Sequence, residues 1–293
     1  MNAPEKMQQH DRAAENVGNI VHLEHFNVVH DDQRLATLFY IVGLGGTRDP
    51  YLFVGLDNMW VNFGRTQAHL PSRGKSPKPE VLRGTIGLVV PSLAELKQRL
   101  ERVSAELSST KFSWREAEGA IETVCPWGNR IRAHAPAREF GPIDLGIAYV
   151  DFDVPEGTAE GIARFYEEVI GAPARAERGR AIVSAGRHQK LTFTETKKAL
   201  PDYDGHHIQV YIADFSTPYA WLKARGLVNM ETDAHEWRFQ WIVDPRDGRK
   251  LFQIEHEVRS MKHPLFGRPL VNRNTGITNM TYVPGYDAFR GTY

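Results

Sequence analysis

The stretch from Gly205 to Asp214 carries side chains that are suited to metal binding and proton transfer. Its residues alternate in the pattern of a strand, with His207, Gln209 and Tyr211 on one face and Ile208, Val210 and Ile212 on the other. A second stretch, from Lys250 to Glu255, alternates in the same way. Neutral imidazole and carboxylate groups suit divalent first-row metal ions, so His207 and Glu255, at the ends of two strands, could share a metal.

The composition is that of an ordinary globular protein without an obvious charged partner. The chain has 293 residues, and its 36 basic and 36 acidic residues cancel, which gives no indication of a nucleic-acid groove or an anionic membrane surface. No apolar run approaches the roughly 18 residues of a membrane span. The single cysteine, Cys125, excludes an intramolecular disulfide and fits a reducing compartment, so we expect a cytoplasmic protein.

An internal repeat organises the chain. The stretch from Phe39 to Gly45 matches that from Phe165 to Gly171, and each is predicted to end an amphipathic helix that follows a strand. The stretch from Arg83 to Ser92 matches that from Gly205 to Asp214 in the same order. The repeat therefore predicts four modules, each a strand, a helix and three further strands.

The module boundaries give the expected domain organisation. Residues 1–18 are expected to form a disordered lead, residues 19–137 a first half with two modules, and residues 143–260 a second half with two modules. Residues 261–293 are predicted to form a loop-rich tail that could cover a cavity or dock on a partner subunit. Asp31 or Asp32 is predicted to cap a first helix, and Ser92 a second.

A strand, a helix ending in Phe-Tyr-x-x-x-Leu/Ile-Gly and three more strands, used four times, resembles the vicinal oxygen chelate superfamily. That group includes glyoxalase I, the fosfomycin and bleomycin resistance proteins, methylmalonyl-CoA epimerase and the extradiol dioxygenases. The turn from Cys125 to Asn129 looks like the family's Asp-Pro-x-Gly-Asn turn, with Cys in place of Asp. The chain also looks like a set of bacterial members marked by the stretches from Asn58 to Asn62 and from His263 to Leu265. The resemblance implies an α+β fold of four βαβββ modules in two halves, with curved mixed sheets around a cavity.

The resemblance also implies where metal ligands would lie, because the family takes them from the first and last strands of its modules. Carried over to this chain, the positions are His25 and His69 in the first module, Thr85 and His134 in the second, Tyr149 and Thr194 in the third, and His207 and Glu255 in the fourth.

Three pairings of the modules stay open at this point. Pairing within the second half gives an extradiol-like set of Tyr149, His207 and Glu255, in which Tyr replaces an expected His and Gln253 could replace the Glu. Pairing within the first half gives His25, His69 and His134. Pairing of the first module with the fourth, as in four-module glyoxalases, gives His25, His69, His207 and Glu255, the chemically most complete set. The four-module length looks like that of extradiol dioxygenases and favours pairing within halves.

The resemblance suggests roles for the remaining candidates. His188 and Tyr211 are expected to move protons, and Tyr149, Gln253, Trp241 and His134 to contact substrate, while His256 and Glu257 are expected to be structural. The implied function is a metal-dependent enzyme, dioxygenase-like or glyoxalase/isomerase-like, that acts on a small organic substrate with vicinal oxygen atoms. The metal is expected to be divalent Fe, Mn, Zn or Ni, and a homodimer is left open. The alternative is a non-enzymatic protein that binds and sequesters a small molecule.

Overall fold

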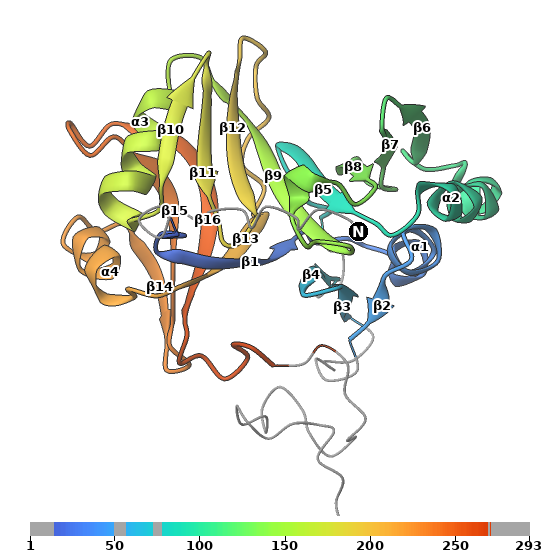
Figure 1. Ribbon diagram of the computed structural model, residues 1–293, viewed down its shortest axis with the longest axis horizontal. Helices are drawn as coiled ribbons and strands as arrows, with labels where there is room; N and C mark the ends of the chain where they lie inside the picture. The colour runs from blue at the N-terminus through green and yellow to red at the C-terminus, as the bar shows by residue number, and fades with distance from the viewer. Residues whose placement is uncertain (1–14, 50–56, 73–77, 269, 271–293) are drawn as a thin grey trace, which may run out of the picture.

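The computed structural model describes residues 15–49, 57–72, 78–268 and 270. Most of the expected lead and tail, residues 1–14, 269 and 271–293, therefore lies outside the described residues. The expected module pattern is present four times, and Figure 1 shows the modules arranged as two sheets with helices packed against them. The α+β fold class predicted from the repeat is confirmed.

The outer modules, the first and the fourth along the chain, build one eight-stranded sheet. The first module comprises β1 (Ile20–Asn27), α1 (Gln33–Ala36) with its π-helical continuation η2 (Thr37–Gly43), β2 (Thr47–Arg48), β3 (Asn58–Phe63) and β4 (Thr66–Pro71). The fourth module comprises β13 (His207–Ile212), α4 (Ser216–Lys223), β14 (Val228–Thr232), β15 (Glu236–Val243) and β16 (Lys250–Ser260). The strand order is β14-β15-β16-β13-β1-β4-β3-β2. We call it the outer-module sheet.

The inner modules build a second eight-stranded sheet in the same way. The second module comprises β5 (Gly84–Val89), α2 (Leu93–Leu107), β6 (Ser113–Ala117), β7 (Ala120–Val124) and β8 (Arg130–His134). The third module comprises β9 (Gly146–Pro155), α3 (Ala159–Arg164) with η4 (Phe165–Ile170), β10 (Ala174–Glu177), β11 (Arg180–Ser184) and β12 (Lys190–Thr196). The strand order is β10-β11-β12-β9-β5-β8-β7-β6, and we call this the inner-module sheet.

Two antiparallel strand pairs decide which modules meet. β1 pairs with β13, and β5 pairs with β9, so the first module joins the fourth and the second joins the third. Of the three pairings left open by the sequence, this is the glyoxalase-like one, and the pairing within halves that chain length favoured is absent from the described sheets. The length of the chain indicates how many modules it contains. It does not indicate which modules pair through their first strands, so the expectation of pairing within halves was wrong.

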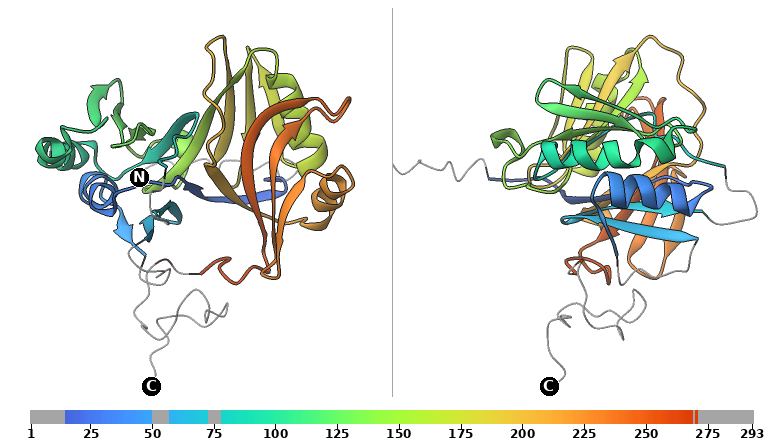
Figure 2. Two further views of the ribbon diagram at one scale, coloured as in Figure 1. Left: turned by 180° about the vertical axis from the view of Figure 1, so that it is seen from behind. Right: turned by 90° about the vertical axis from the view of Figure 1, so that its right-hand side faces the viewer.

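Local sequence explains the helices at the module starts. The Asp32 carboxylate accepts hydrogen bonds from the backbone N–H groups of Arg34 and Leu35 at 2.8 and 3.0 Å, and Ser92 caps α2 by accepting from Glu95 N at 3.2 Å. α2 buries Leu96, Leu100, Val103 and Leu107, which recur at helical spacing along one face. α2 packs on η2, and Figure 2 shows the two helices lying side by side. Among the described residues, no helix is long and apolar enough to cross a bilayer.

The apolar faces of the two sheets share a core. Phe152 of β9 contacts Phe193 of β12 and Phe252 of β16, with ring centroids 5.3 and 5.8 Å apart. These three rings are nearly inaccessible to solvent and therefore contribute several kcal/mol of burial energy in total, about 1.5–3 kcal/mol for each side chain. The packing fixes the inner-module sheet against one side of the outer-module sheet and leaves the polar face of each sheet on its other side.

Candidate metal centre

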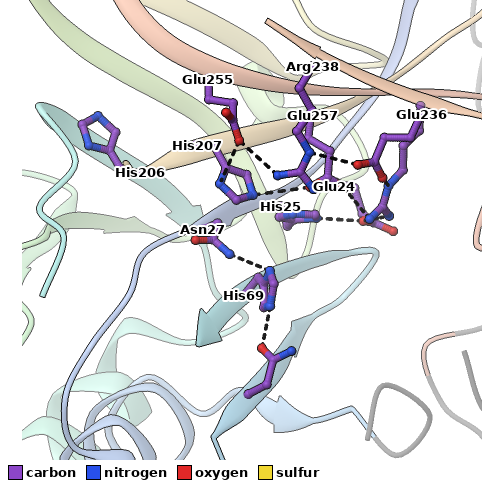
Figure 3. Close-up of polar contacts among 12 residues, drawn as sticks. Glu24, His25, Asn27, His69, His206, His207, Glu236, Arg238, Glu255 and Glu257 are labelled. Atoms are coloured by element: carbon purple, nitrogen blue, oxygen red, sulfur yellow. Dashed lines mark hydrogen bonds and ion pairs between the residues drawn. The ribbon is translucent and has the colours of Figure 1, made fainter. Parts of the chain in front are cut away.

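Three histidines converge on the polar face of the outer-module sheet. His25 lies on β1, His69 on β4 and His207 on β13, and each offers one ligand atom within 4.8 Å of the other two. The strand register explains the convergence: Asn27 stands opposite His207 in the antiparallel pair and beside His69 in the parallel pair. Residues that pair across neighbouring strands point to the same face, so β1 brings the flanking histidines together (Figure 3).

His25 and His207 each present a ring nitrogen without a hydrogen bond. The His25 ring is fully buried, and its Nδ1 lies 3.0 Å from a carboxylate oxygen of Glu24, which fixes the proton on Nδ1. Its Nε2 is buried and accepts no hydrogen bond among the described residues. The same is true of Nε2 of His207, where the nearest carboxylate oxygen belongs to Glu257 at 3.4 Å. A carboxylate behind one nitrogen and a lone pair on the other is how metal-binding histidines are held.

His69 is oriented by its neighbours on the first module. Its ring stacks on Trp60 with centroids 3.7 Å apart, and its Nε2 donates to Oδ1 of Asn58 at 2.6 Å. Its Nδ1 therefore keeps the lone pair and accepts from Nδ2 of Asn27 at 2.6 Å. Burial lowers the pKa of His25 and lowers the pKa of His69 well below its ordinary value. Both rings are therefore neutral at neutral pH, the form that binds metal.

A buried charge network surrounds the three histidines. It contains two guanidinium groups and four carboxylates, those of Arg238, Arg259, Glu24, Glu236, Glu255 and Glu257. Burial acts to raise the pKa of Glu257, but Arg259 and the contact with His207 outweigh it and hold this pKa well below its ordinary value. Its four carboxylates and two guanidinium groups together carry two more negative than positive charges. Uncompensated charge in a protein interior costs several kcal/mol, so a divalent cation would balance the network.

The carboxylate nearest to a ring nitrogen of His207 is not the predicted one. Glu255 lies 3.9 Å from Nδ1 of His207, and its oxygens are engaged by Arg238, Gln240 and Asn229 at 3.0–3.1 Å. Glu257, expected from the sequence to be structural, is only 2% exposed and lies 3.4 Å from Nε2 of His207. The geometry therefore favours Glu257 over Glu255 as a fourth ligand.

The internal symmetry of the sheet gives the same assignment. An approximate twofold axis through the Phe26–Ile208 pair exchanges His25 with His207. The position that the axis relates to His69 is Glu257, because Asn27 pairs with His69 as Gln209 pairs with Glu257. Glu255 and Glu257 alternate along one strand and so point to the same face. This alternation is the sequence signal that could have identified both as candidate ligands.

The segment after β16 covers this face. We call residues 261–268 the strap. Leu265 packs on Trp60, and Phe266 lies against the ring of Tyr211 with centroids 5.0 Å apart. A buried ion pair at 2.9 Å between Arg268 and Asp49 fixes its far end near β2. Figure 1 shows the strap running from β16 toward the first module.

Three further predicted residues lie on this sheet. Tyr211 is 1% exposed and burial raises the pKa of its hydroxyl, which has no hydrogen-bond partner within the described part of the chain. Gln253 and Trp241 pair with each other toward the start of β16, where Lys250 Nζ lies 4.4 Å from the Trp241 ring. Tyr211 thus lies near the centre of the face and the other two at its far end.

The remaining predicted residues lie on the inner-module sheet. Nε2 of His134 and the Tyr149 hydroxyl form a hydrogen bond of 2.9 Å, and the Tyr149 ring lies across Gly87. His188 lies in the turn between β11 and β12 with φ of 64°. The structure does not bring these three residues together with the histidines of the outer-module sheet.

Comparisons with known proteins bear on the fold. No protein-family model matches the chain, and no curated protein matches its sequence significantly. Among solved structures, a candidate dioxygenase from Bacillus subtilis aligns over 90% of this chain and 90% of its own, with a TM-score of 0.58 and 13% identity. Glyoxalase I from Zea mays aligns over 80% of this chain and 92% of its own, with a TM-score of 0.53 and 14% identity. The chain therefore has the fold of the vicinal oxygen chelate superfamily, as its repeat predicted.

Proposed function

We propose that this protein is a metal-dependent enzyme that acts on a small organic substrate with vicinal oxygen atoms. The observation that carries the proposal is the group of three histidines with ligand atoms within 4.8 Å, set in a network with two excess negative charges. Two of the three, His25 and His207, have a buried Nε2 without a hydrogen bond among the described residues, which histidines that cluster on a surface by chance would not have. The residues present fit a divalent ion, with His25, His69, His207 and Glu257 as its ligands.

The pairing of the first and fourth modules favours lyase or isomerase chemistry of the glyoxalase kind over dioxygenase chemistry. A bound divalent metal would act as a Lewis acid and polarise substrate oxygens. The Tyr211 hydroxyl stays protonated because burial raises its pKa, so it can donate a hydrogen bond to a substrate oxygen. Gln209 is fully buried, and neither atom of its side-chain amide has a partner within the described ranges, so it can orient a second oxygen. The strap would exclude water from both.

Elemental analysis of untagged protein, purified without chelator and again after anaerobic metal loading, tests this proposal. We expect about one divalent ion per chain, lost in His207→Ala and retained in His134→Ala, a matched change on the other sheet. Circular dichroism of each variant checks that loss of metal is not loss of fold. Absence of stoichiometric metal under both conditions would contradict the proposal and favour a small-molecule binding protein.

The identity of the ion separates the reaction classes. Zn or Ni as the bound ion would agree with lyase or isomerase chemistry. Turnover of hemithioacetals, the α-hydroxycarbonyl adducts that thiols form with 2-oxoaldehydes, would test that chemistry. Iron with oxygen uptake on catechols would instead assign the dioxygenase class and overturn the preference stated here.

A further inference from the structure

A separate cavity of about 420 Å³ lies at the β10–β12 end of the inner-module sheet, and its lining includes none of the three histidines of the proposed metal centre. Its lining comes from the ends of β10, β11 and β12 and from the turn between the last two. The lining residues are Pro173, Ala174, Arg175, Ile182, Ser184, Gly186, His188, Gln189 and Lys190. The cavity therefore takes in His188, a sequence candidate that the proposed metal chemistry does not use.

The charge of the lining has one sign. Arg175 and Lys190 are cationic, and no carboxylate belongs to the lining. Arg175 approaches Glu177 at 3.6 Å, but both side chains are more than half exposed, and such pairs contribute little. Lys190 forms no ion pair or side-chain hydrogen bond with any described residue. The ammonium group is thus available to a ligand.

The turn that carries His188 is fixed by the two sheets. The side-chain amide of Gln189 donates to Leu23 O and Ile147 O at 2.8 Å, and its oxygen accepts from Leu23 N at 3.1 Å. The His188 ring lies so close to Gly141 that a Cβ there would be 2.3 Å from its Nδ1. A ligand that binds here would not have to order the turn, so little binding energy would be lost to organising the cavity.

The rest of the wall is apolar. Pro173, Ala174 and Ile182 offer carbon surfaces beside the basic groups. A cation-lined cavity with an apolar wall fits an organic anion whose charged group pairs with Lys190 and Arg175 while its body lies on the carbons. We propose that this cavity binds a small carboxylate with an apolar body, independently of the metal centre.

Backbone amide NMR of ²H,¹⁵N-labelled full-length protein tests the assignment, with sodium benzoate and, separately, inorganic phosphate as probes at constant ionic strength. We expect saturable benzoate shifts confined to residues 173–190. Affinity should fall at least about tenfold in the Arg175→Gln/Lys190→Gln double variant, because both charged contacts to the carboxylate are lost. Arg178→Gln, which removes a nearby charge outside the lining, should bind like the wild type.

Each other outcome overturns the assignment. Absence of saturable benzoate shifts at millimolar concentration, or equal affinity in the double variant, would show that the cavity is not a carboxylate site. Binding of phosphate without benzoate would reject the carboxylate class. The metal content of the double variant is expected to equal that of wild type, so failure here is distinguishable from failure of the proposed metal centre.

Discussion

The two sheets share one strand topology but present opposite chemistry on their polar faces. By strand register, the positions of His25, His69, His207 and Glu257 on the outer-module sheet correspond to Thr85, Arg132, Tyr149 and Thr192 on the inner-module sheet. A guanidinium group in place of His69 would repel a metal ion, and the two threonines and the tyrosine are weak ligands.

The balance of acidic and basic side chains also differs between the two polar faces, and the excess of carboxylates lies on the outer one. On the outer face, four carboxylates surround two arginines. On the inner face, Arg132 pairs with Glu122, and Arg130 and Arg180 pair with Asp153 and Asp151. The two sheets share one scaffold, and the side chains at four register positions make only the outer-module sheet a candidate for a metal centre among the described residues.

The largest expected effect comes from replacing corresponding first-strand residues of the two sheets by alanine. His207→Ala should lower metal affinity by at least about a thousandfold, about 4 kcal/mol, because a direct ligand is lost. Tyr149→Ala, at the corresponding inner position, should leave metal content unchanged. Chelator competition followed by elemental analysis measures both. Equal loss in the two variants would mean that the faces do not differ as described.

Two carboxylates on one strand sharpen the comparison further. Glu257→Gln should weaken metal binding by about a hundredfold, whereas Glu255→Gln should weaken it by less than about tenfold, because Glu257 lies 3.4 Å from Nε2 of His207 and Glu255 lies 3.9 Å from Nδ1 of the same ring. Metal dissociation constants from the same competition assay decide the matter. The reverse order of the two variants would restore Glu255 as the ligand.

His30, which lies outside both polar faces, provides a reference for the loss of stability at acidic pH. His30 stacks on Trp127, and burial lowers the pKa of His30 to about 4. The unfolded chain protonates this histidine below pH 6.5 while the folded chain does not, so stability is lost as pH falls from about 6.5 to 4. His30 should contribute about 3 kcal/mol to this loss in urea titrations, so the loss in His30→Gln should be smaller than in the wild type by about that amount. An unchanged slope in the variant would assign the acid sensitivity to other groups.

The smallest effect is expected from a change confined to the inner face. A Cβ on Gly87 would lie 2.1 Å from the Tyr149 ring, so Gly87→Ala should displace that ring and break its hydrogen bond with His134. We expect a destabilisation of about 1–3 kcal/mol from overpacking and no change in metal content. Thermal unfolding and elemental analysis of the variant measure the two quantities. Loss of metal would show that the two faces are coupled.

Sequence reasoning reached the fold because the repeat and the helix caps are local patterns. It also named His207 from the alternation of its strand, and His25 and His69 from the resemblance to the superfamily. It could not select the pairing of β1 with β13, because no local pattern specifies which first strands meet. It placed the fourth ligand at Glu255 because the register of β16 depends on the length of the turn at Asp244–Arg249, and a shift of two residues keeps the same face. Sequence reasoning also placed His134, Tyr149 and His188 at the site, whereas the structure places them on the inner-module sheet. Which strands join into one sheet depends on contacts between distant parts of the chain, and no local pattern specifies them.

The nested order of the two sheets has a consequence for synthesis on the ribosome. The inner-module sheet can complete its pairing once β12 has emerged, whereas β1 must wait for β13, about 180 residues later along the chain. During that interval the chain holds only His25 and His69, two of the four proposed ligands. A chain released before His207 would therefore carry the strands of the inner sheet without a complete metal centre, so metal uptake would distinguish finished chains from such truncated ones.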